Sequence, residues 1–421
     1  MTQLTQKFST RAFFTTIRLL TLALFLMLFG ASTVLAQTRA YVTNVNDFTV
    51  SVIDTVTNTV VATIPDIPTP YGIAVTPNGA FIYVTHLGGS TVSVIDATTN
   101  TVIATIPVGL SPNAVAIAPN GAFAYVTNQF SNNVSVISTA TNTVVSTVPV
   151  GLTPVAVAIT PNGAFAYVAN VNSSTVSIIN TTTNTVVTTI PGMVEPTSLA
   201  VTPNGAFVYV TNASANDVRV IDTATLAIVD TIPVGVAPLG IDITPNGAFA
   251  YVTNASGCAV NGTVSVINTA TNTVTTNVPV GICPQELAVN PSGTSVYVAN
   301  AVSNPISVID TATNTVTATI PTGFTPVTVA FQPRIPIVSL IAQVQELVAE
   351  GVLTQKDGDK LIKKLEGTQT KLNNGQPQAV CGQLGAFINQ VNAFINNRTL
   401  ITSRGQALIT TANAIKSGLG C

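Results

Sequence analysis

Short apolar runs follow one another along most of the chain, each separated from the next by turn residues. One unit has such runs at 72–76, 81–85, 91–96 and 101–106, rich in Val, Ile, Thr and Tyr. These residue types favour β-strands, and the Gly, Pro and Asn between them favour tight turns. The pattern predicts units of four short antiparallel strands, which we name A, B, C and D in chain order.

This unit repeats with a period of 42 residues. Tyr-Val-Thr-Asn, or a close variant, recurs in the B strands at spacings of 42 residues, five times, and then 46: Tyr41, Tyr83, Tyr125, Tyr167, Tyr209, Tyr251 and Tyr297. An insertion between Asn254 and Val264 accounts for the last spacing. In the Pro-Asn-Gly between A and B strands, Gly79 and its counterparts supply the positive φ of a tight hairpin. Four-stranded units at this period indicate a β-propeller.

The two ends of the repeat region predict how the ring closes. Seven A strands and seven B strands are present, but the chain begins its repeats with a B strand at 39–43 and ends them with an A strand at 327–331. These ends must share a blade, which removes the exposed edges of an open array. We therefore predict a seven-bladed β-propeller over residues 37–333, with four-stranded antiparallel blades and closure by one plus three strands.

The N-terminus indicates export. Lys7, Arg11 and Arg18 precede an apolar run at 19–29 and a small residue, Ala36, which is typical of a secretory signal peptide spanning 1–36. No later apolar stretch is long enough to cross a bilayer, so no transmembrane segment is expected after cleavage. The mature protein is expected outside the cell, at the cell surface or in the periplasm.

Composition supports a packed but weakly charged propeller. The chain has 421 residues, of which 47% are hydrophobic and only 7% are charged. Strands buried on both faces between blades explain this balance, with neutral Thr and Asn covering the turns. Residues 37–333 carry a net charge of −9 and residues 334–421 a net charge of +4. The negative propeller disfavours nucleic-acid binding.

Residues 334–421 change to helical spacing, with apolar stripes such as Leu340, Val344 and Leu347. Segments 344–362 and 391–409 match at an offset of 47 without a gap. Two similar helical hairpins in tandem predict a small all-α domain of four helices.

Two family resemblances rest on these motifs. The repeats, with Tyr-Val-Thr-Asn, Val-Ser-Val-Ile-Asp and Thr-Pro-Asn-Gly, resemble the YVTN-type β-propellers of exported and surface-layer-associated proteins. This resemblance implies a binding or scaffold role and no single ligand. The tail, with Ala-Phe-Ile-Asn-Gln-Val at 386–391, resembles FIMAH-type domains, which implies an accessory or attachment role.

Four cysteines in an exported chain predict disulfides, with three possible pairings. The B–C and D–A loops emerge on the same face of a blade, so Cys258 in the inserted B–C loop can meet Cys283 in the next D–A loop. Cys381 begins the third predicted helix and Cys421 follows the fourth, so an antiparallel hairpin brings them together. We predict Cys258–Cys283 and Cys381–Cys421. A metal site is not expected, because zinc requires clustered Cys and His ligands.

Polar residues near the B–C and D–A loops are candidates for a binding face. The end of each B strand carries Asn or His, at Asn44, His86, Asn128, Asn170, Asn212, Asn254 and Asn300. They either line a polar funnel entrance or stabilise their own B–C turns, and His86 is expected to be a solvated loop residue. Glu195 and Glu286 lie near D–A loops and are further candidates on this face.

Few groups in the propeller can transfer protons. The leading hypothesis is therefore a non-enzymatic exported propeller without a cofactor, which binds a protein or a cell-envelope polymer. The alternatives are an enzyme or cofactor-dependent propeller using Glu195, Glu286 or Asp242, and a self-assembling surface-layer component.

Overall fold

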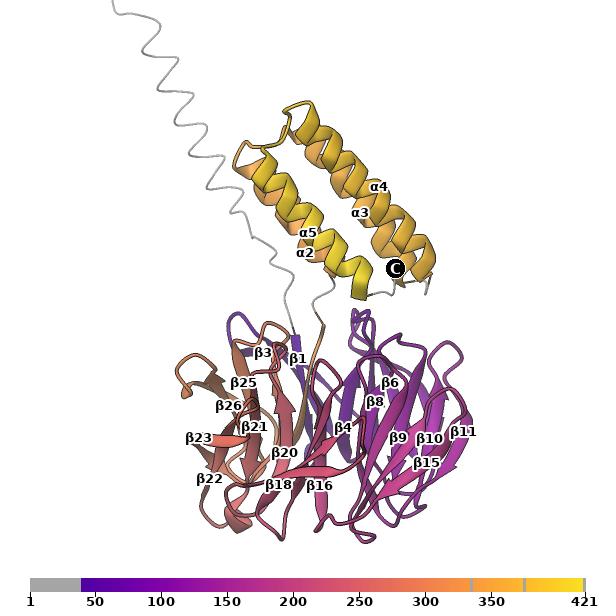
Figure 1. Ribbon diagram of the computed structural model, residues 1–421, viewed down its shortest axis with the longest axis vertical. Helices are drawn as coiled ribbons and strands as arrows, with labels where there is room; N and C mark the ends of the chain where they lie inside the picture. The colour runs from indigo at the N-terminus through magenta and orange to yellow at the C-terminus, as the bar shows by residue number, and fades with distance from the viewer. Residues whose placement is uncertain (1–38, 334–335, 374–375, 419–421) are drawn as a thin grey trace, which may run out of the picture.

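The computed structural model describes residues 39–333, 336–373 and 376–418. Its first part consists of seven four-stranded antiparallel sheets. Figure 1 shows these sheets side by side around the propeller, with the four helices forming a separate unit. The predicted seven-bladed propeller followed by a small helical region is confirmed. The predicted signal peptide lies outside the described residues.

The A strands form the inner wall of the ring, and each pairs with the B strand of its own blade. The A strands are β4 (Pro70–Val75), β8 (Pro112–Ile117), β12 (Pro154–Ile159), β16 (Pro196–Val201), β20 (Pro238–Ile243), β24 (Pro284–Val289) and β28 (Pro326–Phe331). The B strands are β1 (Arg39–Asn44), β5 (Phe81–His86), β9 (Phe123–Asn128), β13 (Phe165–Asn170), β17 (Phe207–Asn212), β21 (Phe249–Asn254) and β25 (Ser295–Asn300).

The C strands follow, and the D strands form the outer edge of each blade. The C strands are β2 (Thr49–Asp54), β6 (Thr91–Asp96), β10 (Asn133–Ser138), β14 (Thr175–Asn180), β18 (Asp217–Asp222), β22 (Asn261–Asn268) and β26 (Pro305–Asp310). The D strands are β3 (Thr59–Ile64), β7 (Thr101–Pro107), β11 (Thr143–Pro149), β15 (Thr185–Ile190), β19 (Ile228–Pro233), β23 (Thr273–Ile282) and β27 (Thr315–Pro321). A short 3₁₀ helix, η1 (Ser256–Cys258), occupies the inserted loop.

The two ends of the repeat region close the ring as predicted. β28 pairs antiparallel with β1, with Tyr41 opposite Ala330 and Val42 opposite Val329. One blade therefore contains the last A strand and the first B, C and D strands, in the order β28-β1-β2-β3.

Turn chemistry explains why the hairpins recur. Gly79 has φ of 67° and its N–H donates to Thr76 O at 2.7 Å, as the Pro-Asn-Gly motif predicted. In the C–D turn, Asp96 Oδ1 accepts the N–H groups of Thr98 and Thr99 at 2.8 and 3.0 Å. Asn100 completes this turn with φ of 56°, a conformation that Asn tolerates better than most residues.

The recurring Tyr joins several blades to the next one. Tyr83, in β5, is fully buried, and its hydroxyl donates to Asn142 Oδ1 in the next blade's C–D turn at 2.7 Å. Tyr125 and Tyr251 make the equivalent bonds to Asn184 and Asn314, at 3.1 and 2.9 Å. The same Tyr therefore supplies both a large apolar ring for the blade interface and a hydrogen bond across that interface.

The Thr of the Tyr-Val-Thr-Asn motif makes a second hydrogen bond between neighbouring blades. Thr85 Oγ1 donates to Asn113 O, in the A strand of the following blade, at 2.7 Å. Thr211 makes the equivalent bond to Leu239 O at 2.8 Å. These ties hold neighbouring A strands in register around the inner wall of the ring.

The helical region contains α2 (Pro336–Ala349), α3 (Gln355–Asn373), α4 (Pro377–Asn396) and α5 (Thr402–Gly418). Their apolar stripes meet in one core that includes Leu340, Leu365, Phe387 and Leu408. Because β1 begins and β28 ends at the A–B hairpin end of the blades, this unit joins the face opposite the B–C and D–A loops. Across the described parts of the chain, no helix combines the length and apolarity required to cross a membrane.

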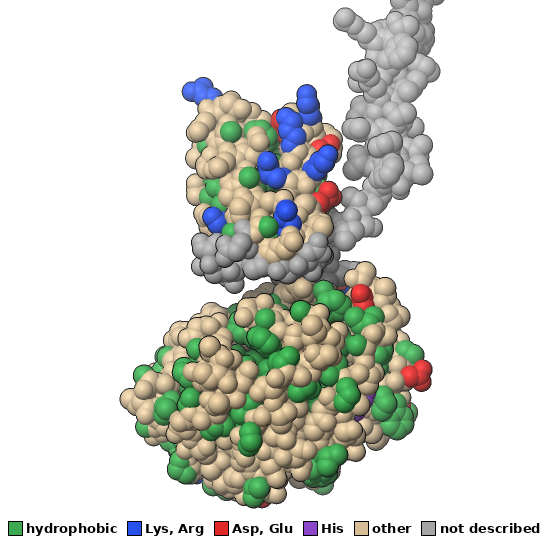
Figure 2. All heavy atoms as spheres, turned by 90° about the vertical axis from the view of Figure 1, so that its right-hand side faces the viewer, with side chains coloured by type: hydrophobic (Ala, Val, Ile, Leu, Met, Phe, Trp, Pro, Cys, Tyr) green, Lys and Arg blue, Asp and Glu red, His purple; other side chains and the backbone are tan. Residues whose placement is uncertain are grey.

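The surface of the propeller carries few charges. Figure 2 shows hydrophobic and uncharged polar side chains over most of the visible propeller, whereas the basic side chains gather on the helical unit. This distribution agrees with the charge asymmetry of the sequence.

Candidate functional site

A cavity of ≈ 340 Å³ lies between the A strands at the centre of the propeller. Residues from β4, β8, β12, β16, β20, β24 and β28 all contribute to its lining. Gln129 and Val171, which begin B–C loops, also line it, so the cavity extends toward the B–C and D–A loop face. Its volume suits a small-molecule ligand.

Glu286 is the charged residue that lines this cavity. Its backbone belongs to β24, and Gly240 of the neighbouring β20 leaves room for its side chain, since a Cβ there would lie 2.6 Å from Glu286 Oε2. The carboxyl therefore extends past β20 toward β16, where Ser198 Oγ donates to Oε2 at 3.5 Å. The pKa of Glu286 is raised to about 7, chiefly by burial. The Ser198 hydrogen bond lowers it and the charge of Asp242 adds a smaller increase, and both effects are included in this value.

Asp242, in β20, supports the strand that carries Glu286. Its Oδ2 accepts the N–H of Val289 in β24 at 2.8 Å, and its Oδ1 accepts the N–H of Ile243 at 2.8 Å. Burial raises the pKa of Asp242 to about 6, although these two backbone hydrogen bonds favour the charged form. The carboxylate thus connects two neighbouring A strands beside the cavity.

Uncharged hydrogen-bonding groups complete the polar part of the site. Tyr71, Asn113, Thr197, Ser198 and Gln285 line the cavity. Burial, and to a smaller extent the charge of Glu286, raise the pKa of Tyr71 to about 12, so its hydroxyl stays protonated at neutral pH and can donate a hydrogen bond. None of the described residues that line the cavity is Lys, Arg or His. The site therefore combines a titratable carboxyl with neutral donors.

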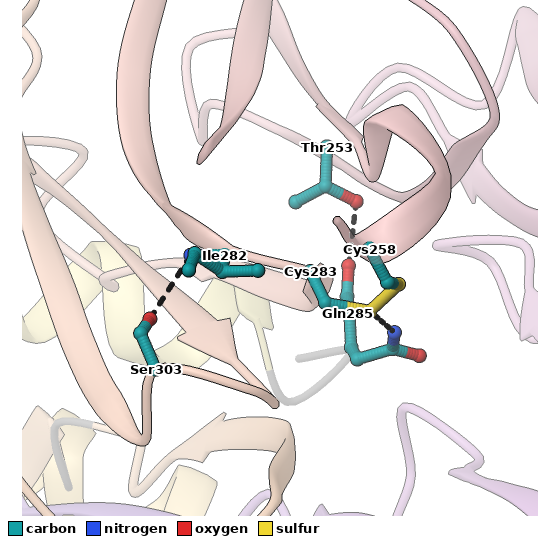
Figure 3. Close-up of a disulfide and its surroundings, with 6 residues drawn as sticks. All are labelled: Thr253, Cys258, Ile282, Cys283, Gln285 and Ser303. Carbon is teal, nitrogen blue, oxygen red and sulfur yellow. Dashed lines mark hydrogen bonds between the residues drawn. A yellow bond between two sulfur atoms is a disulfide. The ribbon is translucent and has the colours of Figure 1, made fainter. Parts of the chain in front are cut away.

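A disulfide holds the segment that enters β24. Cys258 and Cys283 are bonded with their Cα atoms 4.3 Å apart, which is the pair that loop topology predicted. Figure 3 shows Gln285, whose Nε2 donates to Cys283 Sγ at 3.1 Å and whose carbonyl accepts from Thr253 Oγ1 at 2.5 Å. Since Glu286 follows directly, these contacts fix the start of its strand. Cys381 is also disulfide-bonded, and its predicted partner Cys421 lies outside the described residues.

The Asn residues that end the B strands do not line a surface. All six are fully buried: Asn44, Asn128, Asn170, Asn212, Asn254 and Asn300. Asn170, for example, donates from Nδ2 to Thr175 Oγ1 and Ser177 Oγ in its own C strand, at 3.1 and 2.9 Å. The funnel-entrance hypothesis is therefore wrong, because the B–C hairpin folds over each amide and uses it internally.

His86 is likewise buried, contrary to the expectation of a solvated loop residue. Only 4% of it is exposed, and its ring nitrogens pair with Thr91 Oγ1 at 2.7 Å and Ser93 Oγ at 2.9 Å. It thus replaces Asn in the same internal network, and burial lowers its pKa. Throughout the described residues, no group of three or more potential metal ligands is present.

The two predicted glutamates lie in different places. Glu195 is exposed on the loop face, where its Oε2 accepts from the Ser214 hydroxyl. Glu286 lines the central cavity instead of the face on which it was expected.

The cavity residues Tyr71, Ser198 and Gln285 were not singled out from the sequence. A comparison of the A strands at shared positions singles out Glu286 and Asp242 but not these three. The third residue of each A strand is Gly, Ala, Ser or Thr except at Glu286, and the fifth is Ala except at Asp242.

Two family models match the propeller of this chain. A family model described as "Lactonase, 7-bladed beta-propeller" matches residues 36–145, 111–187 and 141–265, together more than half of the chain. The chain belongs to this lactonase family. A YNCE-like β-propeller model matches residues 255–360 of the same lactonase-family chain. No match was found among curated proteins.

Several solved structures share the propeller fold of this lactonase-family chain. A putative 6-phosphogluconolactonase from Bacteroides uniformis aligns with a TM-score of 0.60 and 18% identity, over 70% of this chain and 99% of the other. Kuenenia stuttgartiensis hydrazine synthase aligns at 0.58 and 23%, over 63% and 90%. Dihydro-heme d1 dehydrogenase NirN aligns at 0.52 and 16%, over 67% and 63%.

These comparisons correct the expectation that the protein is not an enzyme. The lactonase family match contradicts it. The expectation was derived from the scarcity of charged groups in the whole propeller. Catalysis depends instead on where individual groups lie, so a low overall charge does not exclude it. The YVTN-type and FIMAH-type assignments stay predictions.

Proposed function

We propose that this protein is an exported hydrolase of small, uncharged lactones, with Glu286 as its general base. The observation that carries the proposal is the Glu286 carboxyl in the central cavity, where burial raises its pKa to about 7. A base is most effective when its pKa lies near the working pH. Membership of the lactonase family supports the reaction class.

The proposed reaction uses groups that line the cavity. The Glu286 carboxylate accepts a proton from water as the water oxygen attacks the lactone carbonyl carbon. The hydroxyl of Tyr71 is available to donate a hydrogen bond to the negative oxygen that develops there, while the Ser198 hydroxyl donates to Glu286. The ring C–O bond then breaks, and the leaving oxygen takes the proton from Glu286. The product is a hydroxy acid, and Glu286 returns to its ionised form.

The charge of the site favours neutral substrates. Glu286 lines the cavity, Asp242 lies in the adjacent strand, and none of the described lining residues is cationic. A phosphorylated lactone would place like charges together without a compensating Arg or Lys. The specificity suggested by the name of the Bacteroides uniformis structure is therefore not transferred to this protein.

Charge selectivity tests this proposal. The mature protein is expected to hydrolyse δ-valerolactone with kcat/KM at least about 100-fold higher than for 6-phosphogluconolactone, since like-charge contacts cost several kcal/mol. Acid release in a pH-stat measures both rates directly. Equal rates would contradict the neutral-substrate assignment, and no hydrolysis of any lactone would contradict the function itself.

We also propose export by a cleaved signal peptide. The basic and apolar segments of residues 1–36 support it, and the Cys258–Cys283 disulfide is compatible with an oxidising compartment. N-terminal sequencing of the mature protein is expected to begin at Gln37. Recovery of the full-length chain from the cytoplasm alone would refute export.

A further inference from the structure

The central cavity has two chemically different sides. In the ring of seven blades, the blade with β24 faces those with β8 and β12, which are three and four blades away. The β24 side presents Gln285 and Glu286, whereas β12 on the opposite side presents Val155 and Val157. The neighbouring β8 blade adds the polar Asn113 and Gln129 to the lining. A ligand that fills this cavity therefore meets a carboxyl on one side and, across from it, an aliphatic wall formed by β12.

The aliphatic wall continues to the loop face. Leu152 lies two residues before β12, and Leu110 lies two residues before β8. Phe130 lies in the B–C loop that follows β9, and its N–H donates to Leu110 O at 3.2 Å, which places the two residues together. Leu110, Leu152 and Phe130 are 59%, 53% and 68% exposed. These three residues, which we call the rim, are apolar and exposed on the loop face in the blades of β8 and β12. The equivalent positions Val236 and Phe324 of other blades are exposed as well.

We propose that the substrate is an amphiphilic lactone whose aliphatic chain lies along β12 and leaves the cavity past Leu110, Leu152 and Phe130. The lactone ring then lies toward Glu286. The lactone ring in this inference rests on the proposed function. The aliphatic chain is inferred separately, from the apolar wall and rim. The absence of cationic side chains among the described lining residues agrees with an uncharged amphiphile.

Chain-length selectivity tests the inference. Each buried methylene is expected to raise kcat/KM about fourfold, so γ-undecanolactone should be hydrolysed at least about tenfold more efficiently than γ-valerolactone. Val155→Asn places a polar side chain on the wall and is expected to reduce this ratio at least about threefold. The substitution suits the fold, because Asn113 occupies the same position in β8. Val145→Asn is the matched control, since Val145 is 54% exposed on the outer strand β11.

The outcomes separate this inference from the proposed function. Equal kcat/KM for the two lactones, with hydrolysis of both, overturns the aliphatic-chain assignment and leaves the hydrolase intact. If neither lactone is hydrolysed, calorimetric binding of γ-undecanolactone to the wild-type protein, weakened by Val155→Asn, still supports the amphiphile site. No binding overturns it. A dimer in sedimentation that is lost in Phe130→Ser would assign the rim to a second copy and also overturn it.

Discussion

Glu286→Gln is expected to lower kcat/KM for lactone hydrolysis by about 10²- to 10⁴-fold, the usual contribution of a positioned general base. Gln has nearly the same size as Glu and can still accept the Ser198 hydrogen bond through its amide oxygen. The substitution therefore removes the proton-accepting carboxylate while keeping the packing over Gly240. Initial rates at saturating and limiting substrate measure the effect, and the loss is expected in kcat.

A matched substitution makes this result specific. Glu195→Gln removes the exposed glutamate of the loop face and is expected to leave the rate within about twofold, since this side chain is not among those that line the cavity. The Glu286→Gln variant should unfold at a temperature no lower than the wild type, because it loses a buried charge. Retained hydrolysis in a folded Glu286→Gln variant would rule out Glu286 as the base.

The stability of the protein is expected to fall as pH rises, by about 2 to 4 kcal/mol between about pH 5 and about pH 8. Burial raises the pKa of Glu286 from 4.5 to about 7 and that of Asp242 from 3.8 to about 6. The folded state therefore keeps protons that the unfolded state releases. Their contribution is fully present below the unfolded pKa values and is lost as pH rises through the folded ones. Denaturant unfolding at a series of pH values measures this slope.

The double variant Glu286→Gln, Asp242→Asn provides the control. Its stability should change much less over the same range, because neither side chain titrates. The window avoids more acidic pH, where Asp222 and Asp310 contribute with the opposite sign, since hydrogen bonds from Thr225 and Thr313 lower their pKa. A wild-type profile that is flat, or parallel to that of the double variant, would show that the two carboxyls are ionised in the folded protein.

Local chemistry explains why much of the fold was predictable. The residues of each hairpin determine its conformation locally: Gly79 and its counterparts supply the turn, and the strands between them consist of β-favouring residues. Because the unit recurs, its count and the incomplete units at the two ends predicted seven blades and the β28–β1 closure. The Cys258–Cys283 pair followed from the same topology.

Side-chain burial at the ends of the strands was less predictable. A position beside a loop suggested exposure for His86 and left open whether Asn170 lines a funnel or stabilises its own B–C turn. The C strand of the same blade supplies hydroxyl partners that draw both side chains inward. The hydrogen bond from Tyr83 to Asn142 joins residues of neighbouring blades. The pairing of Tyr83 with Asn142 cannot be identified until blade-to-blade packing is known.

The sequence by itself determined the repeating strands, the turns, the number of blades, the closure of the ring and the four-helix unit, because these depend on local residue preferences and on counting. Only the tertiary structure decided that Glu286 extends across Gly240 to Ser198, that Asp242 connects two A strands, and that the aliphatic residues of β12 lie across the cavity from Glu286. These arrangements bring together residues from blades far apart in the chain, and burial in a shared cavity then sets their pKa values. The site is a property of the closed ring, and no single repeat contains it.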